Sequence, residues 1–266
     1  MFPTMFRESD IIKLAQITDP HLGKNPGDTL LGVDTDRSLS DVLAQLPTDH
    51  HVIVSGDLSN DASPESYRRF ADTLAQYQIH QWSCLPGNHD DDQVMNRVLG
   101  PAVINPVQVH GRWLVILLNS RVPGYEHGDL STCELAFLDK TLSRHKDLHA
   151  LVFLHHQPVP VGSKWLDQYI VRSADRFFST LDKHNNVRAV CWGHVHQDFH
   201  TVRNGVQLFG SPSTCAQFKP NCDEFTVDTA MPGYRLFQLM PNGALKTEVN
   251  RVSEKDYNID LASCGY

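Results

Sequence analysis

Residues 88–90 place an amide, an imidazole and a carboxylate side by side, in the order Asn88-His89-Asp90. The carbonyl oxygen of Asn88 can bind a metal ion, and His89 can exchange a proton. Pro86 and Gly87 precede them and end a short apolar run, so a loop is expected directly after a strand. An Asn-His pair also occurs in ordinary turns, so its meaning depends on the rest of the chain.

Four further groups of metal-capable side chains follow short apolar runs in the same way. Ligands of parallel α/β sheets bind beyond the carboxyl ends of the strands, so side chains at these positions are expected to meet. The seven candidate metal ligands are Asp19, His21, Asp57, Asn88, His155, His194 and His196. His156 adjoins this set, and we expect it to pack or to support a ligand rather than to bind the metal.

This ligand set combines carboxylate and amide oxygens with imidazole nitrogens, which suits manganese, iron, zinc, cobalt or nickel rather than calcium. Seven ligands exceed the needs of one tetrahedral ion and complete two shells only if one carboxylate bridges and water fills the remaining positions. We expect Asp57 to be the bridge. Two ions about 3.5–4 Å apart would lower the pKa of a shared water toward about 7 and would neutralise the oxygens of a phosphate.

The composition limits the partners of the protein. Lys and Arg number 23 against 31 Asp and Glu, and the formal charge of −8 argues against nucleic acid or an anionic membrane as a partner. The first ten residues carry Arg7, Glu8 and Asp10 and no long apolar core, and no apolar run reaches the ~18 residues of a membrane span, so a cytoplasmic location is expected. Six cysteines without a CxxC pair are expected to be free thiols. The oligomeric state is left open.

The order of elements predicts the architecture. Strands and helices alternate as far as residue 90, which is typical of a parallel α/β sheet, and β-rich sequence follows residue 198. The first helix is expected to be capped by Thr35 or Asp36. We therefore expect two packed sheets flanked by helices in a single domain, residues 1–266, with a motif-bearing core at 11–210, a β-rich part at 211–253 and a polar tail at 254–266.

The motifs Asp-x-His, Gly-Asp, Gly-Asn-His-Asp, a His after a strand and Gly-His-x-His, in this order over residues 11–210, resemble the calcineurin-like metallophosphoesterases. The resemblance implies a four-layer α/β/β/α sandwich of two mixed sheets and a bimetal phosphoesterase. It implies that one metal binds Asp19, His21, Asp57 and His196, and the other Asp57, Asn88, His155 and His194. It places His89 beside the substrate phosphate as a proton donor or electrostatic stabiliser, and implies substrate contacts from His21, Asp57, Asn88, His89 and His196.

Further segments are similar to the class III cyclic nucleotide phosphodiesterases of bacteria, over nearly the whole chain. These segments are residues 30–33, 165–168, 212–220, 225–229 and the final Gly265-Tyr266. The similarity implies hydrolysis of 3′,5′-cyclic AMP to 5′-AMP by a metal-bridging hydroxide, with two divalent or mixed-valence ions. Iron and manganese are expected first, and zinc, cobalt, nickel or magnesium are alternatives.

Other readings of the sequence stay open at this point. Ligand chemistry does not distinguish a cyclic nucleotide from other small phosphodiesters or phosphomonoesters, and only the resemblance favours the former. An inactive binding scaffold of the same fold is disfavoured because such a protein need not keep Asn88 and His89. Trp165, Asp167 and Phe218 are as readily explained by the loop or core as by base stacking. Gln157 departs from the histidine or proline that often follows the His pair in the family.

Overall fold

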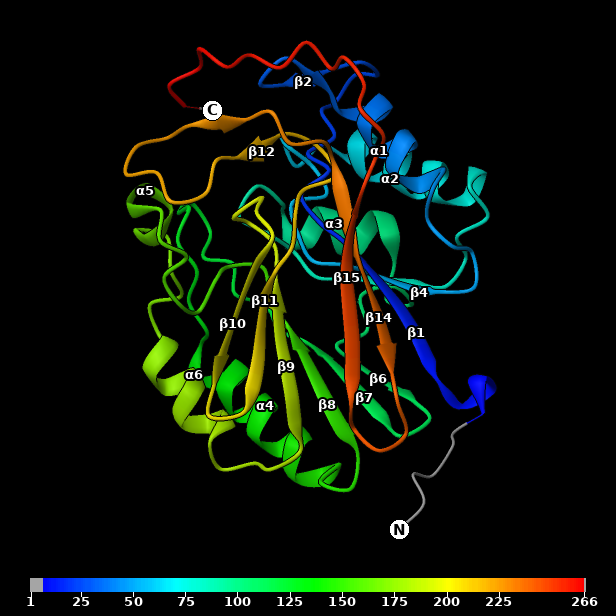
Figure 1. Cartoon of the computed structure of the whole chain (residues 1–266), viewed down its shortest axis with the longest axis vertical. Helices are drawn as coiled ribbons and strands as arrows, with labels where there is room; N and C mark the ends of the chain where they lie inside the picture. Colours follow the sequence, from blue (N-terminus) through cyan, green and yellow to red (C-terminus); the bar gives the residue numbers. More distant parts are fainter. Residues whose placement is uncertain (1–6, 266) are drawn as a thin grey trace.

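Two mixed β-sheets lie at the centre of the molecule (Figure 1). The structure is a computed structural model that describes residues 7–265. Met1–Phe6 and Tyr266 lie outside the described residues, so the expectations that involve them, the start of the N-terminal segment and the final Tyr266, have no counterpart here. No helix in the described part of the chain is both long and apolar enough to cross a membrane.

The first sheet has the strand order β15-β14-β1-β4-β5. Its parallel strands are β1 (Ile12–Ile17), β4 (His51–Val54) and β5 (Trp82–Cys84), and β14 (Gly233–Leu239) and β15 (Leu245–Arg251) extend it in antiparallel pairing. The last strands of the chain thus complete the sheet that the first strand begins.

The second sheet has the order β10-β11-β9-β8-β7-β6. Its strands are β6 (Val107–His110), β7 (Trp113–Leu117), β8 (His149–Phe153), β9 (Val187–Trp192), β10 (Phe199–Arg203) and β11 (Val206–Gly210). The four inner strands are parallel to one another, and the edge strands β6 and β10 are antiparallel to the strands that they adjoin. Two short pairs, β2 (Thr29–Leu30) with β3 (Val33–Asp34) and β12 (Gln217–Phe218) with β13 (Val227–Asp228), lie outside the main sheets.

Alternation of side chains along the strands builds three apolar layers. In β8, Leu151 and Phe153 join Trp113 and Phe237 in the layer between the sheets, whereas Ala150 and Val152 face the helices on the other side. All of these side chains are at most 1% exposed. The inner strands are nearly continuous apolar runs because both of their faces are covered.

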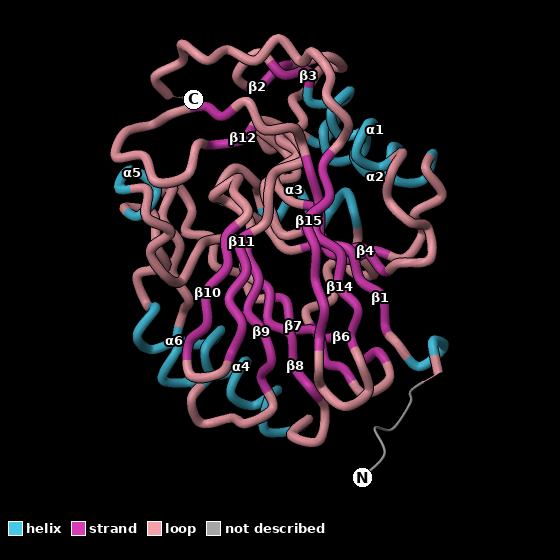
Figure 2. Tube along the Cα trace, in the orientation of Figure 1, coloured by secondary structure: helices cyan, strands magenta, loops and turns pink. Residues whose placement is uncertain are grey.

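Helices cover the outer face of each sheet (Figure 2). The helices are α1 (Thr35–Leu43), α2 (Pro64–Gln76), α3 (Asp92–Leu99), α4 (Thr132–Arg144), α5 (Lys164–Asp167) and α6 (Ala174–Leu181), and a 3₁₀ turn spans Glu8–Asp10. Leu39 of α1 and Phe70 of α2 pack on the first sheet, and Leu138 of α4 and Phe177 of α6 pack on the second. The expected four-layer α/β/β/α sandwich is confirmed.

Several local expectations need correction. Asp34, not Thr35 or Asp36, caps α1 by accepting a hydrogen bond from the Arg37 N–H. The edge strands β6 and β10 have no counterpart among the strands expected from the sequence, and residues 159–172, which look like an insertion loop in the sequence, contain the short helix α5. Most of residues 254–265 are exposed, but Tyr257 is only 2% exposed, so this polar segment contacts the rest of the chain.

Candidate metal centre

Five of the seven candidate ligands have a left-handed backbone, which non-glycine residues seldom adopt. Their φ angles are +53° for Asp19, +49° for His21, +51° for Asp57, +62° for His194 and +49° for His196. Such strained positions cluster at functional sites, where the surrounding fold holds them. Here these residues lie in the turns that directly follow β1, β4 and β9.

Two glycines allow the loops to pack against these side chains. A Cβ atom on Gly87 would lie 2.1 Å from Asp57 Oδ1, and one on Gly193 would lie 2.0 Å from Thr18 Oγ1. Both distances are far below a permitted contact, so the loops after β5 and β9 can pack against the residues that follow β4 and β1 only because these positions are glycine.

One group of ligand atoms gathers around His21. Its Nε2 atom lies 3.3 Å from His196 Nε2, 3.7 Å from Asp57 Oδ2 and 4.0 Å from Asp19 Oδ1. His196 Nε2 is in turn 3.3 Å from Asp19 Oδ1. All four side chains are at most 1% exposed.

A second group gathers around His155. Its Nε2 atom lies 3.1 Å from both Asp57 Oδ2 and Asn88 Oδ1. The centre of the His194 ring lies 5.2 Å from that of the His155 ring. The backbone N–H of His194 donates to both carboxylate oxygens of Asp19 at 3.1 Å. Asp57 Oδ2 is therefore close to both groups, as the bridging role expected from the sequence requires.

The hydrogen bonds of the imidazoles decide which nitrogen faces the centre. Nδ1 of His155 and Nδ1 of His196 each lie 2.8 Å from a backbone carbonyl, that of Ser55 and that of Ala216. A carbonyl only accepts, so each Nδ1 carries a proton, and once the ring is neutral its Nε2 presents a lone pair toward the centre. His21 Nδ1 is likewise 3.2 Å from Asn60 Oδ1. Outer hydrogen bonds of this kind orient the histidine ligands of metal sites.

The centre therefore holds acceptors that face one another. Both ring nitrogens of His194 are buried and have no hydrogen-bond partner among residues 7–265, and Asp57 Oδ2 is contacted at 3.1 Å by His155 Nε2. Leaving such groups unsatisfied is costly. Neutral imidazole lone pairs with two carboxylates form a donor set for cations, so the residues fit a pair of bound metal ions.

Electrostatics agree with this interpretation. Burial lowers the pKa of His21 to about 3 and the pKa of His194 to about 3, so both rings are neutral, as ligands must be. For His155 burial also lowers the pKa, but Asp57 and Asp19 outweigh it and raise the pKa to about 9. Without a cation, His155 thus holds a proton toward Asp57, and a bound metal would replace that proton.

His89 lies at the edge of the centre. Its backbone N–H donates to Asp57 Oδ1 at 2.8 Å, and its ring packs edge-on against His21 at 4.9 Å. The half-buried ring lines a cavity of about 320 Å³ together with Asn88 and His194. The proton donor expected from the sequence therefore faces a space that a substrate can enter.

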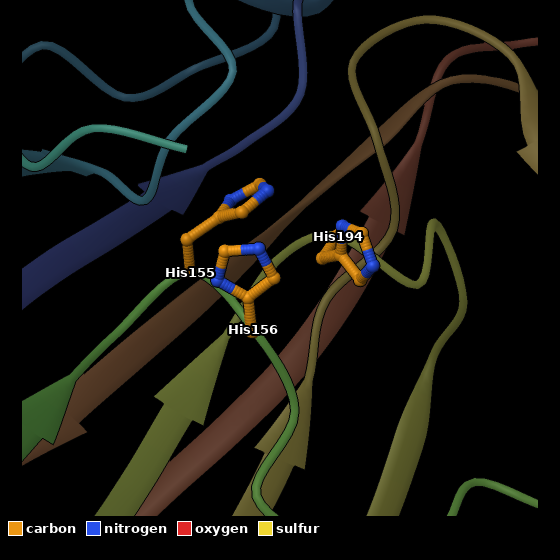
Figure 3. A group of neighbouring side chains, drawn as sticks. All are labelled: His155, His156 and His194. Carbon is orange, nitrogen blue, oxygen red and sulfur yellow. The ribbon is translucent and has the colours of Figure 1, made fainter. Parts of the chain in front are cut away.

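His156 lies closer to the centre than expected. Figure 3 shows His155, His156 and His194 gathered where β8 and β9 end, and their ligand atoms lie within 4.8 Å of one another. His156 Nδ1 is 2.9 Å from Ser120 Oγ. The contacts of His155 with Asn88 and Asp57 distinguish the two adjacent histidines.

Asp90 holds the loops of the centre together, a role that the sequence did not reveal. Its carboxylate accepts hydrogen bonds from the N–H groups of Gly87 (2.9 Å), Ser59 (3.0 Å) and Leu58 (3.2 Å) and from the Tyr67 hydroxyl (3.0 Å). Burial and the neighbouring Asp57 raise the pKa of Asp90 to about 6. Asp90 thus ties the loop of Asp57 to the loop of Asn88 and to α2.

The fold and the centre agree with the sequence family. The chain belongs to the calcineurin-like phosphoesterase family, whose model matches residues 12–198.

The relatives cover nearly the full length of the chain. It is 38% identical over 263 residues to the 3′,5′-cyclic adenosine monophosphate phosphodiesterase CpdA of Escherichia coli K12, and the aligned residues cover 96% of this chain and 95% of that protein. It is 39% identical over 264 residues to the CpdA protein of Vibrio vulnificus, with the same coverage. It is 36% identical to a 3′,5′-cyclic-nucleotide phosphodiesterase of Nostoc, over 91% of this chain and 92% of that protein.

Solved structures support the fold alone. A dimetal phosphatase from Danio rerio superposes with a TM-score of 0.61 at 14% identity, covering 91% of this chain and 99% of that one. A purple acid phosphatase from yellow lupin gives a TM-score of 0.65 at 12% identity, over 93% of this chain and 52% of that one.

Asp90→Ala should destabilise the protein strongly. The substitution leaves buried N–H groups of two loops without an acceptor, at a cost of about 1–3 kcal/mol for each group, so a loss of about 3 kcal/mol or more is expected. Urea unfolding measures it, with Asp147→Ala at an exposed loop position as the control. Equal stability of the two variants would show that Asp90 does not hold the loops.

Proposed function

We propose that this protein hydrolyses 3′,5′-cyclic AMP to 5′-AMP with two bound metal ions. The observation that carries the proposal is the convergence of buried histidine nitrogens on Asp57 Oδ2. The relatives that match the chain over nearly its full length are named as cyclic AMP phosphodiesterases. The acidic chain needs local cations to attract an anionic phosphodiester.

The ligands would divide between two positions that share Asp57. Asp19, His21 and His196, whose ligand atoms lie within 4.8 Å of one another, would hold the first ion with Asp57. Asn88, His155 and His194 would hold the second ion with Asp57, which the 3.1 Å contacts of His155 support. Bound there, the ions would supply an activated water and neutralise the phosphate oxygens. Iron and manganese suit this mixed oxygen and nitrogen set.

His89 would act on the substrate rather than on the metal. Its ring lines the cavity beside Asn88, and the hydrogen bond from its N–H to Asp57 fixes the start of its side chain. From there it would give a proton to the 3′ oxygen of the ribose as the phosphorus–oxygen bond of the ring breaks. His21, Asp57, Asn88 and His196 would contact the same phosphate from the metal side.

We also propose that residues 1–266 form one domain and act in the cytoplasm. The single-domain assignment is supported by β14 and β15, which complete the sheet begun by β1. The cytoplasmic location is supported by six free cysteines, which suit a reducing compartment.

Asn88→Ala should reduce the metal content of the protein. Because Asn88 Oδ1 would be a ligand of only one ion, the purified variant should hold about one metal ion where the wild type holds about two. Metal analysis after gel filtration measures the ratio, and Asn96→Ala, on the exposed side of α3, is the control. An unchanged ratio would remove Asn88 from the ligand set.

His89→Ala should retain both metals but lose turnover selectively. For cyclic AMP, whose leaving alkoxide needs a proton, kcat should fall by roughly 10²–10⁴-fold, whereas a nitrophenyl ester with a good leaving group should be affected far less. Steady-state kinetics on both substrates tests this difference. Full turnover of cyclic AMP by the variant would exclude His89 as the acid.

A substrate panel tests the proposed activity itself. The metal-loaded protein should cleave cyclic AMP with a higher kcat/KM than 2′,3′-cyclic AMP or bis(p-nitrophenyl) phosphate, and it should release 5′-AMP as the product. Chromatography of the products measures this preference. Cleavage of the aryl ester with negligible cleavage of cyclic AMP would favour a phosphoesterase for other small esters.

A further inference from the structure

Residues 254–265, here called the C-terminal strap, are fastened to the first helix. The Tyr257 hydroxyl donates to Asp41 Oδ2 at 2.8 Å, and Lys255 Nζ lies 2.5 Å from Asp41 Oδ1. The guanidinium of Arg37 lies 5.3 Å from the centre of the Tyr257 ring. One carboxylate of α1 thus binds two side chains of the strap.

A second attachment lies at the turn between β2 and β3. The Asp260 N–H donates to the Leu31 carbonyl at 2.8 Å. Gly32, at φ +82°, lies so close to the strap that an added Cβ would be 2.2 Å from the Asn258 carbonyl oxygen. Backbone packing therefore fixes this part of the strap, which crosses the top of the molecule in the view of Figure 1.

The far part of the strap reaches the candidate metal centre. Cys264 and Gly265 line the same cavity of about 320 Å³ as Asn88, His89 and His194. A cavity of this size suits a small organic ligand. The strap thus contributes to the space in front of the metal ligands.

Aromatic side chains form another part of this cavity. Trp165, Tyr169 and Phe225 line it, and the Trp165 and Phe225 rings lie 4.9 Å apart. Phe218 contacts Trp165 at 5.0 Å and stacks on His196 at 4.3 Å, so this aromatic wall is fixed directly to the metal centre. Aromatic faces of this kind stack on nucleobases.

We propose that the C-terminal strap completes a purine-binding subsite between Cys264–Gly265 and the aromatic wall of Trp165, Tyr169 and Phe225. The inference rests on the proposed function, because the phosphate of the substrate must lie at Asn88 and His89 for its base to reach this cavity. The subsite selects a small nucleotide and leaves hydrolysis of an aryl diester, which has no purine, independent of the strap.

Two variants test the proposal from different sides. Deletion of residues 261–266 removes the strap's part of the cavity, and Asp41→Ala releases the strap at a residue that lines neither the cavity nor the candidate ligand set. In each variant the KM for cyclic AMP should rise by at least about fivefold, the loss expected for weakened stacking, while kcat/KM for bis(p-nitrophenyl) phosphate changes by less than about twofold. Asp72→Ala, an exposed position of α2, is the matched control, and metal content verifies an intact centre.

Thiol labelling provides a readout that does not depend on turnover. Cys264 and Cys133 are both exposed, and Cys133 lies on α4, away from the cavity. Adenosine, which has no phosphate, should slow the alkylation of Cys264 at least about twofold at saturating concentration and leave Cys133 unchanged.

The outcomes separate the two proposals. If the wild type does not cleave cyclic AMP, the proposed function is wrong, and the proposed role of the strap in binding the base of cyclic AMP is wrong with it. If the wild type cleaves cyclic AMP but both strap variants keep its KM, or adenosine does not protect Cys264, only the role of the strap is overturned.

Discussion

The structure depends on one electrostatic constraint, which is that buried acceptor atoms face one another at a single point. Asp19 and Asp57 are at most 1% exposed, and the hydrogen bonds of His155 and His196 turn their Nε2 atoms toward these carboxylates. Two buried anions among imidazole lone pairs are unfavourable unless protons or cations lie between them. The left-handed backbone at five of the ligands is a second cost, and the surrounding fold must offset both.

The fold offsets these costs by placing the centre where the two sheets meet. Asp19, Asp57 and Asn88 follow strands of the first sheet, whereas His155, His194 and His196 follow strands of the second. The buried Gln16 side chain links the sheets directly beneath the centre, because its Nε2 donates to Ser55 Oγ at 2.8 Å and to the Trp192 carbonyl at 3.1 Å. This buried polar contact between the sheets therefore helps to fix the relative positions of the ligands.

The sequence indicates which side chains meet at this point because each candidate ligand follows a short, mostly apolar strand, a pattern with few alternatives. Other features depend on contacts that local sequence does not contain. The donors to Asp90 come from three separate segments, and Tyr257 meets Asp41 across 216 positions. The strands β6 and β10 are partly exposed edges without a clear apolar pattern. The choice between His155 and His156 depends on side-chain direction, which spacing alone does not encode.

Anomalous scattering from crystals of the manganese-loaded protein tests the central claim most directly. The account expects two peaks, about 3.5–4 Å apart, with one carboxylate oxygen of Asp57 in contact with both. A single peak, or two peaks of which Asp57 touches only one, would contradict it.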